Sequence, residues 1–214
     1  MAQSVITIDM VSDVICPWCF LGKRRLDKAL SLISEVKVEV VYRPFFLDST
    51  IPAGGIDRKK YMTDKFGEER LKTIHDPLIA AGKEDGVPYN FDAITRTPNT
   101  LDAHRLIRWA LPVGKQAEMK EALFVAYWRD GKDVGDHAVL ADIAMSVGMD
   151  REIILADLIS DKDKQAVMAE TVQAQQMGIT GVPTFIINHK YGVSGAQSAQ
   201  VIADAIMKVA NQPA

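Results

Sequence analysis

The sequence of 214 residues has few cysteines, no excess of one charge and no long apolar run. Two cysteines cannot build a disulfide scaffold for a chain of this length, which is long enough to fold around an apolar core. Lys and Arg number 25 against 28 Asp and Glu, and this balance gives no general attraction to nucleic acid or anionic membranes. No stretch reaches the roughly 18 apolar residues of a membrane span. The composition predicts a soluble globular protein.

The N-terminal segment 1–15 lacks the features of a secretion signal. No basic region precedes an apolar run, and Asp9 and Asp13 interrupt the segment. We therefore expect a cytoplasmic protein. In a reducing compartment, a pair of cysteines is more typical of catalysis or redox sensing than of a structural bridge.

The two ends of the chain show strand patterns, and the middle is helical. Residues 5–11 and 37–42 alternate as strands do, on either side of a helix expected at 17–34. Residues 183–187 and 191–194 predict a hairpin before a last helix. Helices are expected between them at 57–66, 67–82, 100–111, 115–130, 137–148, 151–160 and 162–177, with a long loop at 83–99. The pattern predicts an α/β core, 1–49 with 179–214, around a helical insertion, 50–178.

The two cysteines form the motif Cys16-Pro17-Trp18-Cys19, where a predicted strand leads into a predicted helix. Pro17 suits the first helical position, so Cys16 is expected at the helix N-terminus, where free N–H groups and the helix dipole stabilise a thiolate. Cys16 would attack a thiol or disulfide, and Cys19, nearly one turn later, would resolve the mixed disulfide. Zinc needs about four ligands, which the remaining histidines do not supply at a suitable spacing, so no metal site is expected.

The motif and the order of elements resemble the thioredoxin superfamily. The large helical insertion is similar to that of its DsbA-like branch, and the segment 12–19 resembles the FrnE group of that branch. The segments 179–185 and 193–197 resemble C-terminal signatures of the same group. The resemblance spans nearly the whole chain and implies a thioredoxin-like fold and thiol–disulfide oxidoreductase activity.

The resemblance implies roles for particular residues. Cys16 would be the nucleophile and Cys19 the resolving thiol, while Pro17 and Trp18 would tune the redox balance of the pair. The periplasmic oxidant DsbA has His where this chain has Trp18. Pro183 would be the cis-proline that faces the dithiol, and Val182 would offer backbone groups to an extended substrate.

A related branch contains 2-hydroxychromene-2-carboxylate isomerases and kappa-class glutathione transferases, and the segment 97–105 resembles one that those enzymes share. That resemblance implies a glutathione contact at Asn99, and Ser194 and Gly195 are candidates to bind the γ-glutamyl end of glutathione. The segment 194–198 has a second interpretation as a turn and cap before the last helix. Asn99 has a second interpretation as the cap of the helix expected near residue 101. Those enzymes usually carry Ser at the position of Cys16, so the complete dithiol favours disulfide chemistry.

We therefore expect thiols or disulfides of proteins or small molecules as partners, with glutathione as a candidate co-substrate and no tightly bound cofactor. Two rival hypotheses are a glutathione-dependent isomerase or transferase that uses Cys16 as a lone thiolate, and a non-catalytic module that binds a peptide or ligand. The sequence leaves open whether the protein is a monomer or a homodimer, and whether Asp9 or Asp13 assists proton transfer. His104 is interpreted as a hydrogen-bonded structural residue, and Lys23, Arg24 and Arg25 as a solvated face.

Overall fold

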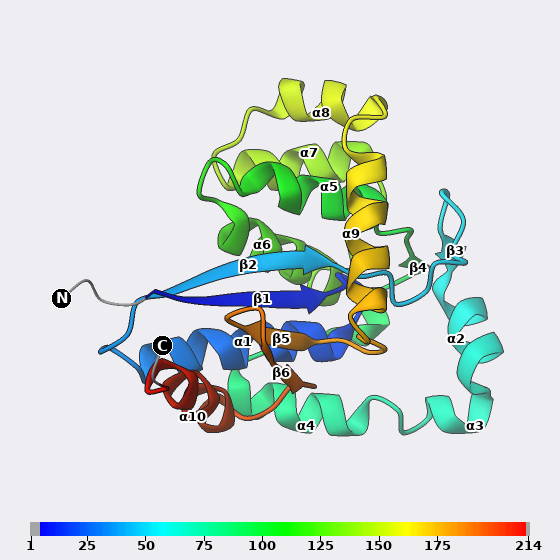
Figure 1. Ribbon diagram of the computed structural model, residues 1–214. Helices are drawn as coiled ribbons and strands as arrows, with labels where there is room; N and C mark the ends of the chain where they lie inside the picture. Colours follow the sequence, from blue (N-terminus) through cyan, green and yellow to red (C-terminus); the bar gives the residue numbers. More distant parts are fainter. Residues whose placement is uncertain (1–4, 213–214) are drawn as a thin grey trace.

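The centre of the molecule is a four-stranded sheet of strand order β2-β1-β5-β6 (Figure 1). The computed structural model describes residues 5–212. Strand β1 runs parallel to β2 and antiparallel to β5, which forms a hairpin with β6. The strands are β1 (Ile6–Ser12), β2 (Val38–Pro44), β5 (Thr184–Ile187) and β6 (Tyr191–Ser194). The predicted α/β class and the order of core elements are confirmed.

Helices cover the sheet on both sides (Figure 1). In the view of Figure 1, α5 to α8 are stacked above the β1–β2 pair, and α1, α4 and α10 lie below it. The insertion turns out to be mainly helical, as predicted. The helices are α1 (Pro17–Ser31), α2 (Arg58–Phe66), α3 (Glu68–Leu71), α4 (Asp76–Asp85), α5 (Leu101–Ala110), α6 (Gln116–Trp128), α7 (His137–Ser146), α8 (Arg151–Ile159), α9 (Lys164–Gln176) and α10 (Ala199–Ala210).

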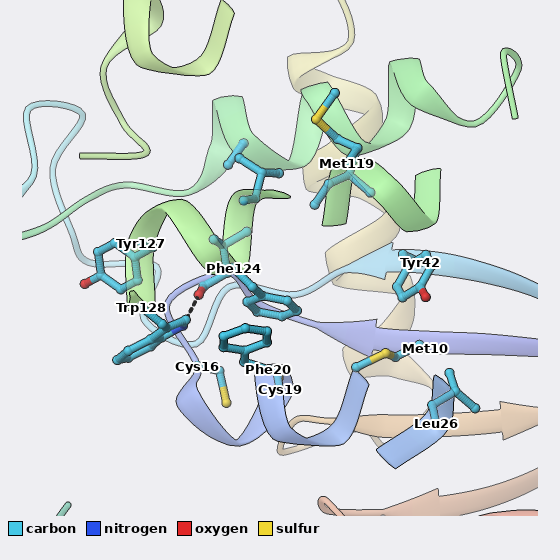
Figure 2. Close-up of a cluster of buried hydrophobic side chains, with 14 of the residues drawn as sticks. Met10, Cys16, Cys19, Phe20, Leu26, Tyr42, Met119, Phe124, Tyr127 and Trp128 are labelled. Atoms are coloured by element: carbon cyan, nitrogen blue, oxygen red, sulfur yellow. Dashed lines mark hydrogen bonds between the residues drawn. The ribbon is translucent and has the colours of Figure 1, made fainter. Parts of the chain in front are cut away.

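One continuous core joins the sheet to the helices on both sides. Ile8 and Met10 of β1 are buried, as are Phe20 and Leu26 of α1 and Phe124 of α6. The Phe20 and Phe124 rings are stacked at 5.1 Å between centroids, close to the cysteines in Figure 2. Each large apolar side chain buried in this way contributes roughly 1.5–3 kcal/mol. This packing fixes α1, and with it the cysteines, between the sheet and the insertion.

The prediction of a single helix at 67–82 is wrong, because two helices occupy this part of the chain. Gly67 ends α2 with φ 76°, a conformation that favours glycine. The short helix α3 follows, and α4 begins only at Asp76, with a proline in its first turn. The break allows α2 and α4 to run in different directions (Figure 1).

A second, two-stranded sheet was not predicted. Strands β3 (Ile56–Asp57) and β4 (Arg96–Thr97) pair antiparallel, although 57 was expected to start a helix and 83–99 to be a loop. Strands of two residues are too short to show an alternating pattern. The division into a core and an insertion at residues 50 and 178 stays a prediction.

The interpretation of Lys23, Arg24 and Arg25 as a solvated face is wrong. The Lys23 side chain is only 5% exposed and pairs with Asp27 and with Glu121 of α6. Arg24 also pairs with Glu121, and Arg25 bonds to Asp85 of α4. Charged residues were assigned to solvent, but α4 and α6 cover this side of α1 and bring carboxylates with them.

None of the helices within residues 5–212 combines the length and the apolar character that crossing a membrane requires.

Candidate active site at the Cys16–Cys19 dithiol

The dithiol lies at the carboxyl end of β1, where the chain turns into α1. Cys16 is the N-cap residue of α1 and Pro17 follows in the first turn, as the sequence predicts. The Cys19 N–H donates to the Cys16 carbonyl at 3.0 Å and begins the helix. On the other side, the Trp128 indole N–H donates to the Val14 carbonyl at 2.9 Å. The turn before Cys16 is thus tied to α6, which restricts where the first cysteine can lie.

The Val182–Pro183 segment meets the dithiol from the other half of the chain. The register of β5 against β1 pairs Thr184 with Val11, so residues 182 and 183 lie beside the end of β1. The Val182–Pro183 peptide bond is cis. The Cys16 thiol donates to the Val182 carbonyl at 3.5 Å. This contact joins residues that are 166 positions apart in the sequence.

The two cysteines have different surroundings. Both are free thiols. Cys16 is 3% exposed and lines a cavity of about 430 Å³ together with Pro17, Trp18 and Val182. Cys19 is fully enclosed. Burial raises the pKa of Cys19 well above its usual range, and the hydrogen bond and charge of Cys16 raise it further. An external reagent can therefore meet Cys16 from the cavity, whereas Cys19 faces the protein interior.

Lys120 of α6 is a buried cation close to the dithiol that sequence reasoning missed. Its side chain is enclosed, with Nζ 4.7 Å from the centre of the Phe124 ring. Burial lowers the pKa of Lys120 to about 8, although the charges of Cys19, Asp13 and Cys16 favour its protonated form. The Lys120 charge in turn acts to lower the pKa of Cys19. A cation in this position favours a thiolate at the dithiol.

Asp13 and His104 form a second buried group at the end of β1. His104 Nε2 lies 3.2 Å from Asp13 Oδ1, and the Leu47 N–H donates to Asp13 Oδ2 at 2.8 Å. Burial acts to raise the pKa of Asp13, but hydrogen bonds from His104, Leu47 and Thr100 outweigh it and the pKa is lowered. Burial lowers the pKa of His104 in spite of its contact with Asp13. An ionised Asp13 therefore accepts a hydrogen bond from a neutral His104.

The other acidic candidate, Asp9, has different partners. Asp9 bonds to Arg43 at 2.6 Å and to His189 at 3.0 Å. Asp13, by contrast, interacts electrostatically with Lys120. Of the two carboxylates that the sequence left open, Asp13 is the one connected with the buried charges near the cysteines.

The cavity at Cys16 is formed largely by the insertion. Trp18 is 40% exposed, and the Tyr89 hydroxyl donates to the Pro17 carbonyl at 2.5 Å. Figure 2 shows Cys16 near the Trp128 indole, which also lines the cavity. The remaining walls come mainly from the segment that runs from α2 into α4 and include Tyr61, Met62, Phe66, Ile74 and Leu78. Arg58, the first residue of α2, also lines this cavity and was not among the residues predicted from the sequence.

The three residues that the sequence suggested for glutathione binding do not all lie together. Ser194 and Gly195 share a depression of about 510 Å³ with Val182 and Pro183, and the Gly195 N–H donates to the Pro183 carbonyl at 2.8 Å. Asn99 is elsewhere, with its amide nitrogen donating to the Ile51 carbonyl and its oxygen accepting from the Leu101 N–H. Its side chain thus serves the start of α5. Among residues 5–212, no group of three His, Cys, Asp or Glu residues is suited to hold a metal ion.

A family model described as a DSBA-like thioredoxin domain matches residues 7–207. The chain belongs to this family. It is 31% identical to the probable DsbA oxidoreductase SCO1869 from Streptomyces coelicolor, whose crystal structure superimposes with a TM-score of 0.90 and coverage of 98% of this chain and 92% of that one. It is 28% identical over 205 residues to the uncharacterized protein YwbO of Bacillus subtilis strain 168, covering 94% and 96% of the two chains.

A more distant DsbA-like structure is the cytosolic disulfide reductase DsbM from Pseudomonas aeruginosa with GSH. It has a TM-score of 0.64 at 18% identity and covers 95% of this chain and 98% of that one. At this identity the likeness shows the fold alone. The DsbA-like, thioredoxin-type fold expected from the sequence is confirmed.

Proposed function

We propose that this DsbA-like protein is a thiol–disulfide oxidoreductase that works through a mixed disulfide at Cys16. The observation that carries the proposal is the contrast between the cysteines: Cys16 lines a cavity at a helix N-terminus, and Cys19 is enclosed beneath it. A substrate sulfur that enters the cavity meets Cys16 first. The enclosed Cys19 is then placed to react with Cys16 and not with a second external molecule.

In the direction of substrate reduction, the Cys16 thiolate attacks one sulfur of a disulfide. A bond forms between Cys16 and that sulfur, the substrate S–S bond breaks, and the other sulfur leaves with the electron pair as a thiolate. The Cys19 thiolate then attacks Cys16 and releases the second substrate thiolate. The substrate has gained two electrons, and the protein dithiol has become a disulfide. Oxidation of a substrate dithiol is the same sequence in reverse.

Val182 and Pro183 support this proposal from the substrate side. The Val182 carbonyl accepts a hydrogen bond from the Cys16 thiol. Val182 and Pro183 both line the depression that contains Ser194 and Gly195. An extended peptide or a glutathione molecule in this depression would lie beside the reactive sulfur. DsbM, which shares the fold, was solved with GSH. Glutathione as co-substrate, its contact at Asn99 and a cytoplasmic location stay predictions.

The test mixes fully reduced wild type, Cys16→Ser and Cys19→Ser with a fluorescent glutathione disulfide and follows one round of thiol release, for which the protein dithiol supplies the two electrons. We expect Cys16→Ser to abolish turnover. We expect Cys19→Ser to stop after one exchange and to accumulate a mixed disulfide at Cys16, visible by mass spectrometry. Turnover by Cys16→Ser at the wild-type rate would refute the proposal. Continued turnover of a glutathione-dependent isomerisation by Cys19→Ser would favour the lone-thiolate alternative.

A further inference from the structure

Arg58 is a buried cation at the cavity without an acidic partner. The residue is 8% exposed, and it forms no ion pair with a carboxylate anywhere in 5–212. Its Nη1 donates to the Tyr127 hydroxyl at 3.2 Å, and its guanidinium lies 5.5 Å from the centre of the Trp128 ring. A buried charge is costly unless it is paired, and a guanidinium has five N–H donors. Arg58 therefore retains unused capacity to bind an anion.

The second sheet holds Arg58 in place. Asp57 and Ile56 of β3 pair with β4, and the Arg58 N–H donates to the Thr95 carbonyl at 2.9 Å. Tyr127, which accepts from Arg58, donates to the Arg96 carbonyl at 3.1 Å. Arg58 is thus held both by its backbone N–H and by its guanidinium. A fixed cation binds an anion with little loss of side-chain entropy.

The rest of the cavity is apolar or positive. No Asp or Glu is among its lining residues, which include the cations Lys65 and Arg70. Asp48 pairs with Lys65 at 2.8 Å, whereas Arg70 lies 5.7 Å from the centre of the Phe66 ring and has no ion pair in the described part of the chain. His75 stacks on Phe91, and burial together with the Arg58 charge lowers its pKa. Arg58 and Arg70 thus give the cavity positive charge that no ion pair among residues 5–212 offsets, within largely apolar walls.

We infer that the cavity beside Cys16 selects disulfides and thiols that carry a carboxylate, and that Arg58 binds this carboxylate while the substrate sulfur meets Cys16. This inference rests on the proposed oxidoreductase function. The charge-assisted N–H···O bond forms within apolar walls, where it is stronger than in water. The apolar side chains of Met62 and Phe66 then hold the hydrocarbon or aromatic part of the substrate. An uncharged disulfide of the same shape lacks the contact with Arg58.

The experiment uses two aromatic disulfides of the same shape, dithiobis(nitrobenzoate) and its dicarboxamide, in which an uncharged amide replaces each carboxylate. The reduced protein is mixed with each probe. Cys16 attacks one sulfur, a coloured nitrothiophenolate leaves with the electron pair, and Cys19 then releases the second one as the protein disulfide forms. The ratio of the two rate constants, carboxylate over carboxamide, measures selection for the negative charge.

We expect Arg58→Gln to lower the rate with the carboxylate probe roughly 10- to 100-fold, as loss of a charge-assisted hydrogen bond would, and to leave the carboxamide rate nearly unchanged. Arg58→Lys keeps the charge and should retain part of the selection. Arg151→Gln, which removes a partly exposed arginine on α8 that pairs with Asp142, should retain the full ratio. An equal fall for both probes in Arg58→Gln would overturn the inference and leave the proposed function intact.

Two further measurements distinguish selection for the carboxylate from a folding defect of the variants and from the reaction at Cys16 itself. Nitrobenzoate, which lacks the sulfur, should competitively inhibit the reaction of wild-type protein with the carboxamide probe, and nitrobenzamide should not. Equal inhibition by the two compounds would overturn the inference, even if the Arg58 variants fail to fold. Cys16→Ser should react with neither probe. Unchanged rates in Cys16→Ser would instead refute the proposed function.

Discussion

Replacing Lys120 by methionine is expected to stabilise the protein by about 3 kcal/mol at neutral pH. The Lys120 side chain is 1% exposed and forms no ion pair with a carboxylate in the described residues. Burial lowers its pKa from the usual 10.5 to about 8, so the folded state disfavours the protonated ammonium. At about 1.4 kcal/mol for each pKa unit, the difference amounts to about 3 kcal/mol. Methionine has a similar volume and carries no charge.

The sign of the effect gives it a characteristic pH dependence. Between pH 8 and 10.5 the unfolded lysine binds a proton that the folded one has lost, so Lys120 makes wild-type stability rise with pH in this window. Below pH 8 the cost of the buried ammonium is fully present. The advantage of Lys120→Met should therefore be greatest at neutral pH and shrink as the pH approaches 10.5.

The assay is urea unfolding in the presence of a reductant that keeps both cysteines as thiols. The variant should unfold at a higher midpoint with an unchanged slope, and its melting temperature should rise by about 6–12 °C. Lys208→Met, on the exposed side of α10, serves as the control and should change stability by less than about 0.5 kcal/mol. If Lys120→Met is no more stable than wild type at pH 7, the protein does not bear a net cost for the buried ammonium at this position.

The same substitution should impair the chemistry. The Lys120 charge acts to lower the pKa of Cys19, so its removal disfavours the resolving thiolate. Lys120→Met should therefore release substrate more slowly from the mixed disulfide. The reduced form also loses a stabilising cation, so the reduction potential of the dithiol should become more negative when measured against a glutathione buffer. Stability and activity thus change in opposite directions.

Two further substitutions test the packing and the charges around the site. Gly22→Ala would place a Cβ 2.8 Å from Pro183 Cγ, so we expect it to lower the free energy of unfolding by roughly 1–3 kcal/mol and to slow the reaction at Cys16. Gly54→Ala, with open space around its Cβ, is the control and should change neither the stability nor the rate. Urea unfolding measures the stability, and turnover assays measure the rate. Asp13→Asn should cost roughly 1–3 kcal/mol at pH 7. Wild-type stability should fall below pH 6.5, because unfolded His104 takes up a proton that the folded residue does not. It should fall further below pH 3.8, because unfolded Asp13 takes up a proton that the folded carboxylate does not, and the unfolding midpoints of Asp13→Asn should show a smaller second fall.

The parts of the fold that follow local rules could be predicted from the sequence. The β-branched alternation of β1, followed by Cys16 and a proline suited to a helix start, predicts the strand, the turn and α1. The hairpin of β5 and β6 follows from a short apolar run and a turn. The meeting of Val182 with Cys16 joins distant segments, so local patterns do not show it; the resemblance to the thioredoxin superfamily does.

What the sequence did not predict depends on how the insertion folds back. Lys120 lies in a charged stretch that is typical of a solvated helix face, yet α6 is covered on most sides and encloses its side chain. Lys23 was misjudged for the same reason, since its partner Glu121 comes from α6. Arg58 depends on β3 and β4, which are two residues long and give no periodic signal. Charged residues are assigned to solvent by default, and only tertiary contacts correct that assignment.

The two buried cations should affect catalysis in different ways. Lys120 acts on the cysteines from inside the protein, so its removal should slow the reaction of every substrate by a similar factor. Arg58 lies at the cavity, so its removal should matter only for substrates with a carboxylate. In the double variant Lys120→Met, Arg58→Gln, the first release of nitrothiophenolate from the carboxylate probe should slow as in Arg58→Gln, and the second release should slow as in Lys120→Met, because the cations act on different steps. With the carboxamide probe, the double variant should be no slower than Lys120→Met alone. The insertion would then supply both the reactivity of the dithiol and the choice of its substrate, through two separate charges.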